Sequence, residues 1–356
     1  MSLLTSEQAE LAASVRALLA KRSDSAAVRR AIASDAGYDT ALWSTLCEQI
    51  GVAALAIPEQ FGGIGAGTIE THVVMEELGR TLTPSPMLGS AVFAAQLLLA
   101  LGDEATNAKL LPGIADGSML AAVAWSDAAG TWGTPAVAAR NGVLSGTAHY
   151  VLDGDLADVL LVVAADGDEL GVYEVDPSQA QRQHTPSLDV TRRLATVTLD
   201  AVAGMRIGSD AGAALSAALG AAVIGQSAEQ AGAASRILEL TVEYSKTRVQ
   251  FGRPIGSFQA LKHRMADLHV LVEAARSASY AAALGTIDAS VAKAYCSDAF
   301  YAVAGECIQL HGGIAITWEH DAHLYFKRAH SAAQLFGTPD QHVRALAPDL
   351  GLEVGS

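Results

Sequence analysis

A short segment with two arginines, an aromatic ring and glycine has the residue types of an anion-binding site. It reads SKTRVQFGRPIGSFQ and follows a long alanine-rich stretch. Arg248 and Arg253 flank the pair Phe251-Gly252. A guanidinium group binds phosphate through paired hydrogen bonds, and glycine lets the backbone approach a ligand closely. The segment therefore suits a phosphate-bearing ligand, although an arginine at a helix end also commonly caps carbonyls or pairs on the surface.

A second polar segment lies nearer the C-terminus, within ECIQLHGGIAITWEHDAHLYFKRA. Gln309 offers a polar edge, and Gly312 and Gly313 permit close backbone approach. His320 and His323, with acidic neighbours, suggest a metal site. They form only an i, i+3 pair without a third ligand at helical spacing, so we expect no metal there.

The motifs of several common catalytic sites are absent from the sequence. It contains no GxSxG nucleophile elbow, no P-loop and no glycine-rich dinucleotide fingerprint. A dinucleotide, if one binds, must therefore be held by another architecture.

Composition restricts the class of protein. The chain has 356 residues, of which 51% are hydrophobic and 17% charged, enough for two or three globular domains with a large core. The 38 acidic residues outnumber the 23 Lys and Arg, which argues against nucleic acid as a partner. The apolar runs are interrupted by charges and glycines before reaching the roughly 20 residues of a membrane span. We therefore expect neither nucleic acid nor a membrane as a partner.

The cysteines and the N-terminus indicate the compartment. Cys47, Cys296 and Cys307 form no CxxC pair, and the odd number favours buried thiols in a reducing environment. The first residues form an amphipathic helical pattern with Thr5 or Ser6 as N-cap, without the apolar core of a signal peptide. The sequence thus predicts a cytoplasmic protein.

Hydrophobic periodicity divides the chain into three parts and predicts an α+β multidomain protein. Residues 1–118 have helical spacing, interrupted by IPEQFGGIGAG. Residues 119–208 read as short strands with the turn pairs Asn141-Gly142, Asp153-Gly154 and Asp166-Gly167, as expected of hairpins. Residues 209–356 return to long helices rich in small residues, which favours a closely packed bundle.

Taken in order, six segments make the chain resemble the acyl-CoA dehydrogenase family over almost its whole length. They are PEQFGGIG, EELGRTLTPSP, LLPGIADG, LDVTRRLATVTLD, YSKTRVQFGRPIGSFQALKHRMADL and QLHGGIAITWEHDAHLYFKRA. The resemblance implies an N-terminal helical domain, a middle β domain and a C-terminal four-helix bundle. It also implies FAD as cofactor and an acyl-CoA thioester as substrate.

The resemblance gives the arginine segment a role. In this family the matching corner holds the FAD pyrophosphate of a neighbouring subunit. Arg248 would bind the phosphate, Phe251 would pack on the cofactor, and Gln309, Gly312 and Gly313 would contact the adenosine half.

The chain departs from the family at the catalytic base. The family's glutamate, which removes the α-proton, usually precedes a Gly-Thr pair, but here QLFGTP places Phe336 there. The alternative base position falls near Ala222 and Val223, again without a carboxylate. Glu229 and Glu243 lie further along the same helix, where helix-surface or interhelical pairing is the more ordinary role. The catalytic residue is therefore unknown from the sequence.

The middle domain departs as well. AWSDAAGTWG replaces the family's flavin-contacting stretch, and Trp125 and Trp132 alter the shape of that region. HYVLDGD replaces the aromatic–Ile–Thr segment, with Tyr150 at the aromatic and Leu152 at the threonine. Leucine cannot donate a hydrogen bond to a flavin ring.

This pattern resembles the glutamate-lacking subunit of heteromeric bacterial acyl-CoA dehydrogenases, including those acting on steroid side-chain CoA thioesters. It implies a paralogous subunit that supplies the glutamate, and an electron-transferring flavoprotein as acceptor. Two alternatives stay open: a self-sufficient homomeric dehydrogenase with a non-standard base, and a non-catalytic subunit that binds CoA ligands or partner chains.

Overall fold

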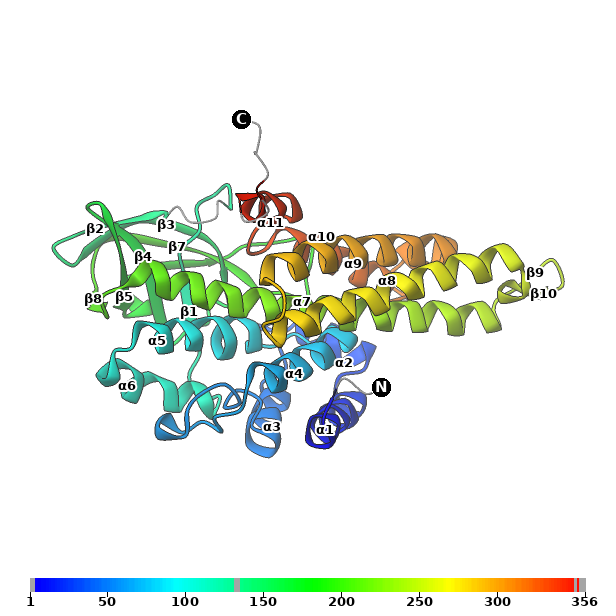
Figure 1. The fold of residues 1–356 in the computed structure, drawn as a ribbon, viewed down its shortest axis with the longest axis horizontal. Helices are drawn as coiled ribbons and strands as arrows, with labels where there is room; N and C mark the ends of the chain where they lie inside the picture. The colour runs from blue at the N-terminus through cyan, green and yellow to red at the C-terminus, as the bar shows by residue number, and fades with distance from the viewer. Residues whose placement is uncertain (1–3, 131–134, 349–350, 352–356) are drawn as a thin grey trace.

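The computed structural model describes residues 4–130, 135–348 and 351. Helices, a β-sheet and a long helical bundle follow one another along the chain and pack side by side (Figure 1). This confirms the predicted fold class. The chain passes from helices to strands between Ala115 and Ala121, and back between Ile207 and Ala211. The predicted domain boundaries, at residues 118/119 and 208/209, remain a prediction.

The N-terminal part consists of helices, four of which begin at a polar cap residue. Thr5 forms a capping box with Gln8 at the start of α1, and Asp24, Asp39 and Asp103 cap α2, α3 and α6. The predicted break near Pro58 is the short 3-10 turn η1, Glu59–Phe61. The helices are α1 (Ser6–Arg22), α2 (Ser25–Ile32), α3 (Thr40–Ile50), α4 (Thr68–Thr81), the π-helical η2 (Met87–Ala94), α5 (Ala95–Leu101) and α6 (Glu104–Ala115).

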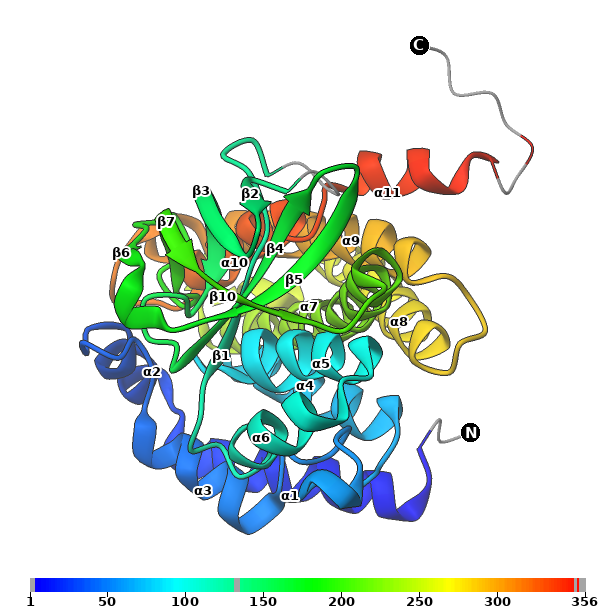
Figure 2. The same cartoon turned by 90° about the vertical axis from the view of Figure 1, so that its left-hand side faces the viewer.

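The middle part is one mixed sheet, which covers the N-terminal helices in Figure 2. Its strand order is β6-β7-β3-β2-β4-β5-β8, with β1 pairing β4. The pairs β1–β4 and β2–β4 are parallel and the others antiparallel. The strands are β1 (Ala121–Ala124), β2 (Val137–Arg140), β3 (Val143–Leu152), β4 (Val159–Asp166), β5 (Glu169–Val175), β6 (Gln181–His184), β7 (Leu194–Ala203) and β8 (Met205–Ile207).

Two of the three predicted hairpin turns are confirmed. Asn141-Gly142, both with positive φ, joins β2 to β3, and the turn after Asp166 joins β4 to β5. The prediction for Asp153-Gly154 is wrong, because β3 and β4 are not neighbours in the sheet. Strand β2 lies between them, so this turn is a crossover instead. Turn residues indicate where the chain bends, but they do not determine which strand of the sheet the following strand pairs with.

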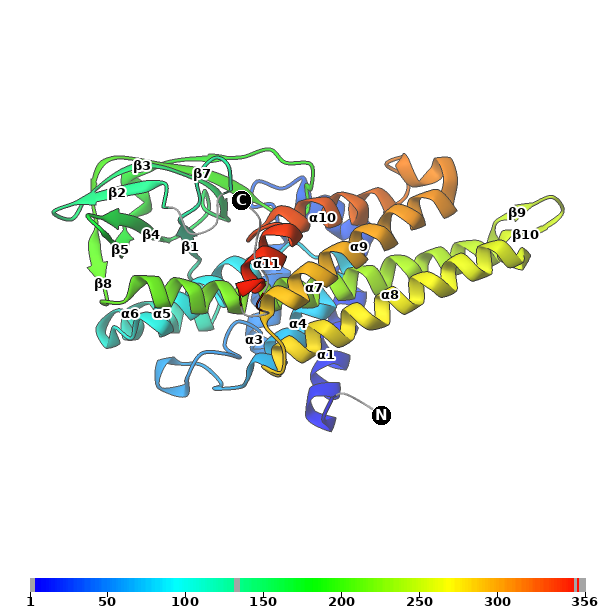
Figure 3. The same ribbon diagram turned by 45° about the horizontal axis from the view of Figure 1, so that its top comes forward.

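The C-terminal part is the predicted four-helix bundle, α7 to α10. Figure 1 shows it extending to one side, with the β9–β10 hairpin at its far end. Beyond the prediction, a further helix α11 follows α10 and packs against α9 (Figure 3). The elements are α7 (Ala211–Thr247), β9 (Val249–Gln250), β10 (Arg253–Pro254), α8 (Gln259–Ala283), α9 (Ala289–His311), α10 (Ala322–Gln334) and α11 (Pro339–Leu346).

Helix α7 corrects one expectation from the sequence. We expected no segment long and apolar enough to cross a membrane, yet the 37 residues of α7 meet that criterion by length and composition. Most of its apolar stretch is buried against α4, α8 and α9. Its apolar character is therefore accounted for by its place in the core of this fold.

Two glycines set the crossing of α4 and α7. A Cβ on Gly79 would lie 2.1 Å from the carbonyl oxygen of Glu229, and a Cβ on Gly232 would lie 2.0 Å from that of Glu76. Each helix therefore presents a glycine to the backbone of the other. Only glycine permits so close an approach.

We expect Gly232→Ala to lower the free energy of unfolding by at least about 2 kcal/mol, because its methyl group overlaps a backbone atom that cannot move alone. The matched control is Gly220→Ala in the same helix, where a Cβ meets nothing within 4 Å. That control should gain up to about 1 kcal/mol from helix propensity. Urea denaturation measures both, and equal effects would contradict the proposed crossing constraint.

Candidate functional site

The position expected to hold a catalytic base is occupied by a buried aromatic cluster. Phe336 is 4% exposed, and its ring lies edge-on to Phe93, with centroids 5.4 Å apart. Phe93 in turn contacts Trp125, with centroids 6.3 Å apart. The backbone of Phe336 is left-handed at φ 63, and His342 Nε2 lies 3.0 Å from its carbonyl oxygen. No proton acceptor is present on the side chain at this position.

A buried lysine fixes the segment that carries Phe336. Lys293 on α9 donates hydrogen bonds to the carbonyl oxygens of Ala332 and Leu335 and to Oε1 of Gln226. It thereby caps the end of α10 directly before Phe336. Burial lowers the pKa of Lys293 to about 7.

Glu229, the first alternative carboxylate, belongs to a buried ion cluster. Its Oε1 accepts from Nη1 of Arg328 at 2.6 Å, and its Oε2 accepts from Arg192. Arg328 also binds Oδ2 of Asp189 at 2.7 Å and Oγ1 of Thr191 at 2.6 Å. Sequence analysis missed both arginines, which appear only as parts of the segments TRR and FKRA. With a guanidinium on each oxygen and 6% exposure, Glu229 is placed for interhelical pairing.

Glu243, the second alternative, lies on the surface. It forms an exposed ion pair of 2.7 Å with Lys246, one turn further along α7. Ala222 and Val223, at the other family position, are buried and apolar. Neither Glu243 nor the position of Ala222 and Val223 places a carboxylate beside the aromatic cluster around Phe336.

We expect Glu229→Gln to lower the free energy of unfolding by about 3–5 kcal/mol, because two buried arginines would lose their shared carboxylate. Glu243→Gln should change it by less than about 1 kcal/mol, because its pair is exposed. Urea denaturation of both variants measures the difference. A small effect at residue 229, accompanied by loss of dehydrogenase activity, would instead identify Glu229 as a base.

Asp153 lies near the ion cluster and follows Leu152 directly. Burial raises the pKa of its carboxyl from 3.8 to about 7, while Arg192 opposes the shift. Between those two pH values the folded chain retains a proton that the unfolded chain has lost. This contribution to stability is complete below about pH 4 and is lost as the pH rises to about 7.

Asp153→Asn should remove that pH dependence, and asparagine tolerates the left-handed backbone of φ 52 at this residue. At about 1.4 kcal/mol per pKa unit, the stability of the variant relative to the parent should rise by about 2–3 kcal/mol between pH 5 and pH 8. Urea midpoints at the two pH values measure this. Parallel pH profiles for parent and variant would show that Asp153 titrates normally.

The residues predicted to hold FAD lie at the opposite end of the bundle from Phe336. Arg248, at the C-cap of α7, and Gln309, near the end of α9, are both exposed. The 13 residues of α10 separate Gly312 and Gly313 from Phe336, a distance of about 20 Å. Figure 1 shows these ends of α7 and α9 together, beside the β9–β10 hairpin.

This corner is open, as a ligand or partner site requires. Phe251 is 91% exposed, the largest exposed fraction among the described large apolar residues. A Cβ on Gly252, Gly312 or Gly313 would meet nothing within 4 Å. Gly313 also lacks a positive φ, so neither packing nor backbone geometry in this chain requires glycine there. The corner can therefore accommodate a phosphate group that approaches from outside the chain.

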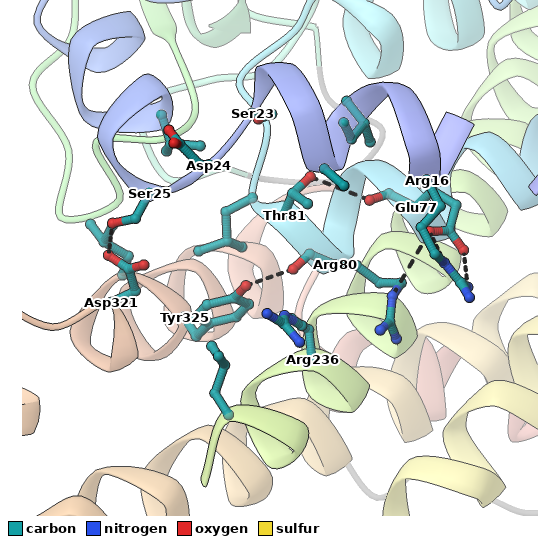
Figure 4. A pocket seen from close by; sticks show the side chains of 16 residues that line it. Arg16, Ser23, Asp24, Ser25, Glu77, Arg80, Thr81, Arg236, Asp321 and Tyr325 are labelled. Atoms are coloured by element: carbon teal, nitrogen blue, oxygen red, sulfur yellow. Dashed lines mark hydrogen bonds and ion pairs between the residues drawn. The ribbon is translucent and has the colours of Figure 1, made fainter. Parts of the chain in front are cut away.

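The other polar features have structural roles. The groove in Figure 4, of about 440 Å³ between the N-terminal helices and the bundle, contains polar groups that are paired with one another: Arg16 with Glu77 at 2.5 Å, and the Ser25 hydroxyl, which donates to Oδ1 of Asp321 at 2.7 Å. His320 packs against His311, and His323 against Trp318. Within the described ranges, no three metal-binding side chains converge. Trp132 lies outside the described residues.

Comparison with known proteins defines the family. Residues 5–118 match the acyl-CoA dehydrogenase N-terminal domain, and residues 212–350 match the C-terminal domain. The chain is 44% identical over 349 residues to acyl-CoA dehydrogenase IpdE2 of Mycolicibacterium smegmatis, covering 98% of this chain and 100% of the relative. IpdE2 of Mycobacterium tuberculosis is also 44% identical, over 97% of both chains.

Solved structures of acyl-CoA dehydrogenases have the same fold as this chain. The ChsE4-ChsE5 complex from Mycobacterium tuberculosis superposes with a TM-score of 0.90 at 26% identity, over 100% of both chains. A variant of the Tcur3481-Tcur3483 steroid ACAD gives 0.86 at 30% identity, over 97% of this chain and 98% of that one. The chain belongs to the acyl-CoA dehydrogenase family of oxidoreductases, whose cofactor is FAD. This confirms the resemblance seen in the sequence.

Proposed function

We propose that this chain is one subunit of a heteromeric acyl-CoA dehydrogenase and that a paralogous partner supplies the catalytic glutamate. The observation that supports this most directly is Phe336, buried in an aromatic cluster at the base position. Glu229 and Glu243, the alternative carboxylates, are held in ion pairs. Two related structures, ChsE4-ChsE5 and Tcur3481-Tcur3483, are themselves named as pairs of chains.

The reaction is the α,β-dehydrogenation of an acyl-CoA thioester. A carboxylate of the partner removes the proton from the α-carbon, and a hydride leaves the β-carbon. FAD, when bound, supplies the hydride acceptor. The proposed final electron acceptor is an electron-transferring flavoprotein, and the proposed location is the cytoplasm. The relative named a steroid ACAD favours an acyl chain of fatty acid or steroid side-chain type.

This chain contributes the open corner to a flavin seated in the partner. Arg248 would neutralise the pyrophosphate, Phe251 would pack on the cofactor, and Gln309, Gly312 and Gly313 would border the adenosine. The corner and this chain's own Phe336 lie at opposite ends of α10, about 20 Å apart. The open corner and the missing base together support a site that is shared between two subunits.

The test is the visible absorption spectrum of the chain purified alone and after co-expression with the paralogue encoded beside it. We expect a colourless lone chain, and a yellow complex with one flavin per two chains that oxidises acyl-CoA. Replacing the partner's glutamate should abolish turnover without loss of flavin. A full flavin complement and activity in the lone chain would support the homomeric alternative instead.

Arg248→Ala should lower the flavin content of the co-expressed complex by about tenfold or more, because a charge-assisted contact to phosphate is lost. Lys246→Ala, which removes an exposed cation two residues earlier, is the matched control and should retain the flavin. Flavin released on denaturation, divided by protein concentration, gives the ratio. Equal flavin contents in the two variants would contradict the role of Arg248.

A further inference from the structure

Lys293 is fully buried and joins three helices of the bundle. It lies on α9 with 0% exposure. Its side chain donates to Oε1 of Gln226 on α7 and to the carbonyl oxygens of Ala332 and Leu335 at the end of α10. An ammonium group has three N–H donors, so these three acceptors use all of them. The carbonyls at a helix C-terminus also favour a positive charge, which makes this a well-satisfied place for a buried lysine.

The turn after α10 is held through its backbone oxygens. Lys293 binds the carbonyl of Leu335, and Nε2 of His342 on α11 lies 3.0 Å from the carbonyl oxygen of Phe336. The backbone of Phe336 is left-handed at φ 63, which is unfavourable for a residue with a side chain. Two consecutive carbonyls are thus bound by side chains from two different helices, and these contacts hold the turn in a conformation that Phe336 does not favour by itself.

The same lysine reaches the turn of α7 near the alternative base position. Gln226 lies one helical turn after Ala222. Residue 336 and the pair Ala222-Val223 are the two positions at which a carboxylate was expected from the sequence. Lys293 contacts the neighbourhood of both, so it fixes the two positions relative to each other although neither carries a carboxylate in this chain.

We propose that Lys293 is a positioning residue of the dehydrogenase site, which sets the backbone of the turn at residue 336 together with His342, whichever side chain stands there. The contacts to the turn are made with backbone oxygens and do not involve the phenyl ring. The edge-on contact of Phe336 with Phe93 is then a consequence of the turn and not its cause. This role requires neither FAD nor a partner chain, so its test can fail while the flavin experiment succeeds, and the reverse also holds.

The experiment is amide hydrogen exchange of the full-length chain. The amides of Leu335 and Gly337 report on the turn, because they donate to the carbonyl oxygens of Ser331 and Gln334. We expect Lys293→Met to raise their exchange rates at least about tenfold, because two charge-assisted hydrogen bonds to the turn are lost. Amides of α4 should change less. Unchanged exchange at the turn, or an equal rise in α4, would overturn the proposal.

A second variant separates the lysine from the aromatic ring. Phe336→Leu keeps the backbone contacts of the turn and should leave the exchange rates of Leu335 and Gly337 within about threefold of the parent, since no hydrogen bond is lost. Exchange as fast as in Lys293→Met would show that the ring holds the turn, and the proposal would be wrong. The matched control is Lys262→Met, which removes an exposed lysine of α8 and should leave the turn unchanged.

A third variant does not touch Lys293, in case Lys293→Met does not fold. His342→Leu removes the contact with the carbonyl of Phe336 and should raise the exchange rate of the Gly337 amide by about threefold or more, as expected for one neutral hydrogen bond. Circular dichroism verifies the fold of each variant. Parental exchange at Gly337 in folded His342→Leu would show that the turn does not depend on these side-chain contacts and would overturn the proposal.

Discussion

The arrangement of the three parts depends on one turn of α7, around Glu229. Its carbonyl oxygen faces Gly79 of α4 so closely that a methyl group there would lie at 2.1 Å. Its carboxylate binds Arg192, from the loop between β6 and β7, and Arg328 of α10. One residue thus contacts the N-terminal helices, the sheet and the bundle. A charge buried this deeply is tolerated only when it is paired, so the pairing also fixes the three parts relative to one another.

The ion pairs of Glu229 also limit what its carboxylate can do chemically. Each oxygen of the Glu229 carboxylate accepts a hydrogen bond from a buried guanidinium group, so neither oxygen is free to reach a substrate. At the base position, burial of Phe336 against Phe93 offsets the cost of its left-handed backbone, about 1–2 kcal/mol, through apolar contact. The region where an acyl-CoA dehydrogenase needs a carboxylate is therefore packed with aromatic rings.

The two ends of the bundle differ accordingly. Phe336 itself is buried, and the end of α10 before it is capped by Lys293. Around Phe251 the chain presents an exposed ring, glycines with open space beside them and the exposed Arg248. An exposed phenylalanine at a hairpin tip is stable only at a cost in hydration, which contact with a partner or ligand would remove. The two ends of the bundle thus differ in how far their aromatic side chains are exposed.

The sequence by itself determined the three-part fold, the long helix α7, the hairpin at Asn141-Gly142 and the absence of a carboxylate at residue 336. These follow from periodicity, turn residues and motif order, which are local properties. Tertiary structure alone decided that Glu229 pairs with Arg192 and Arg328, that Asp153 is buried, and that β2 separates β3 from β4. These features depend on contacts between residues far apart in the sequence. A single sequence does not show which distant charged residues or strands come into contact. Local residue patterns can be read from the sequence, whereas pairing between residues far apart in the sequence depends on how the helices and strands pack.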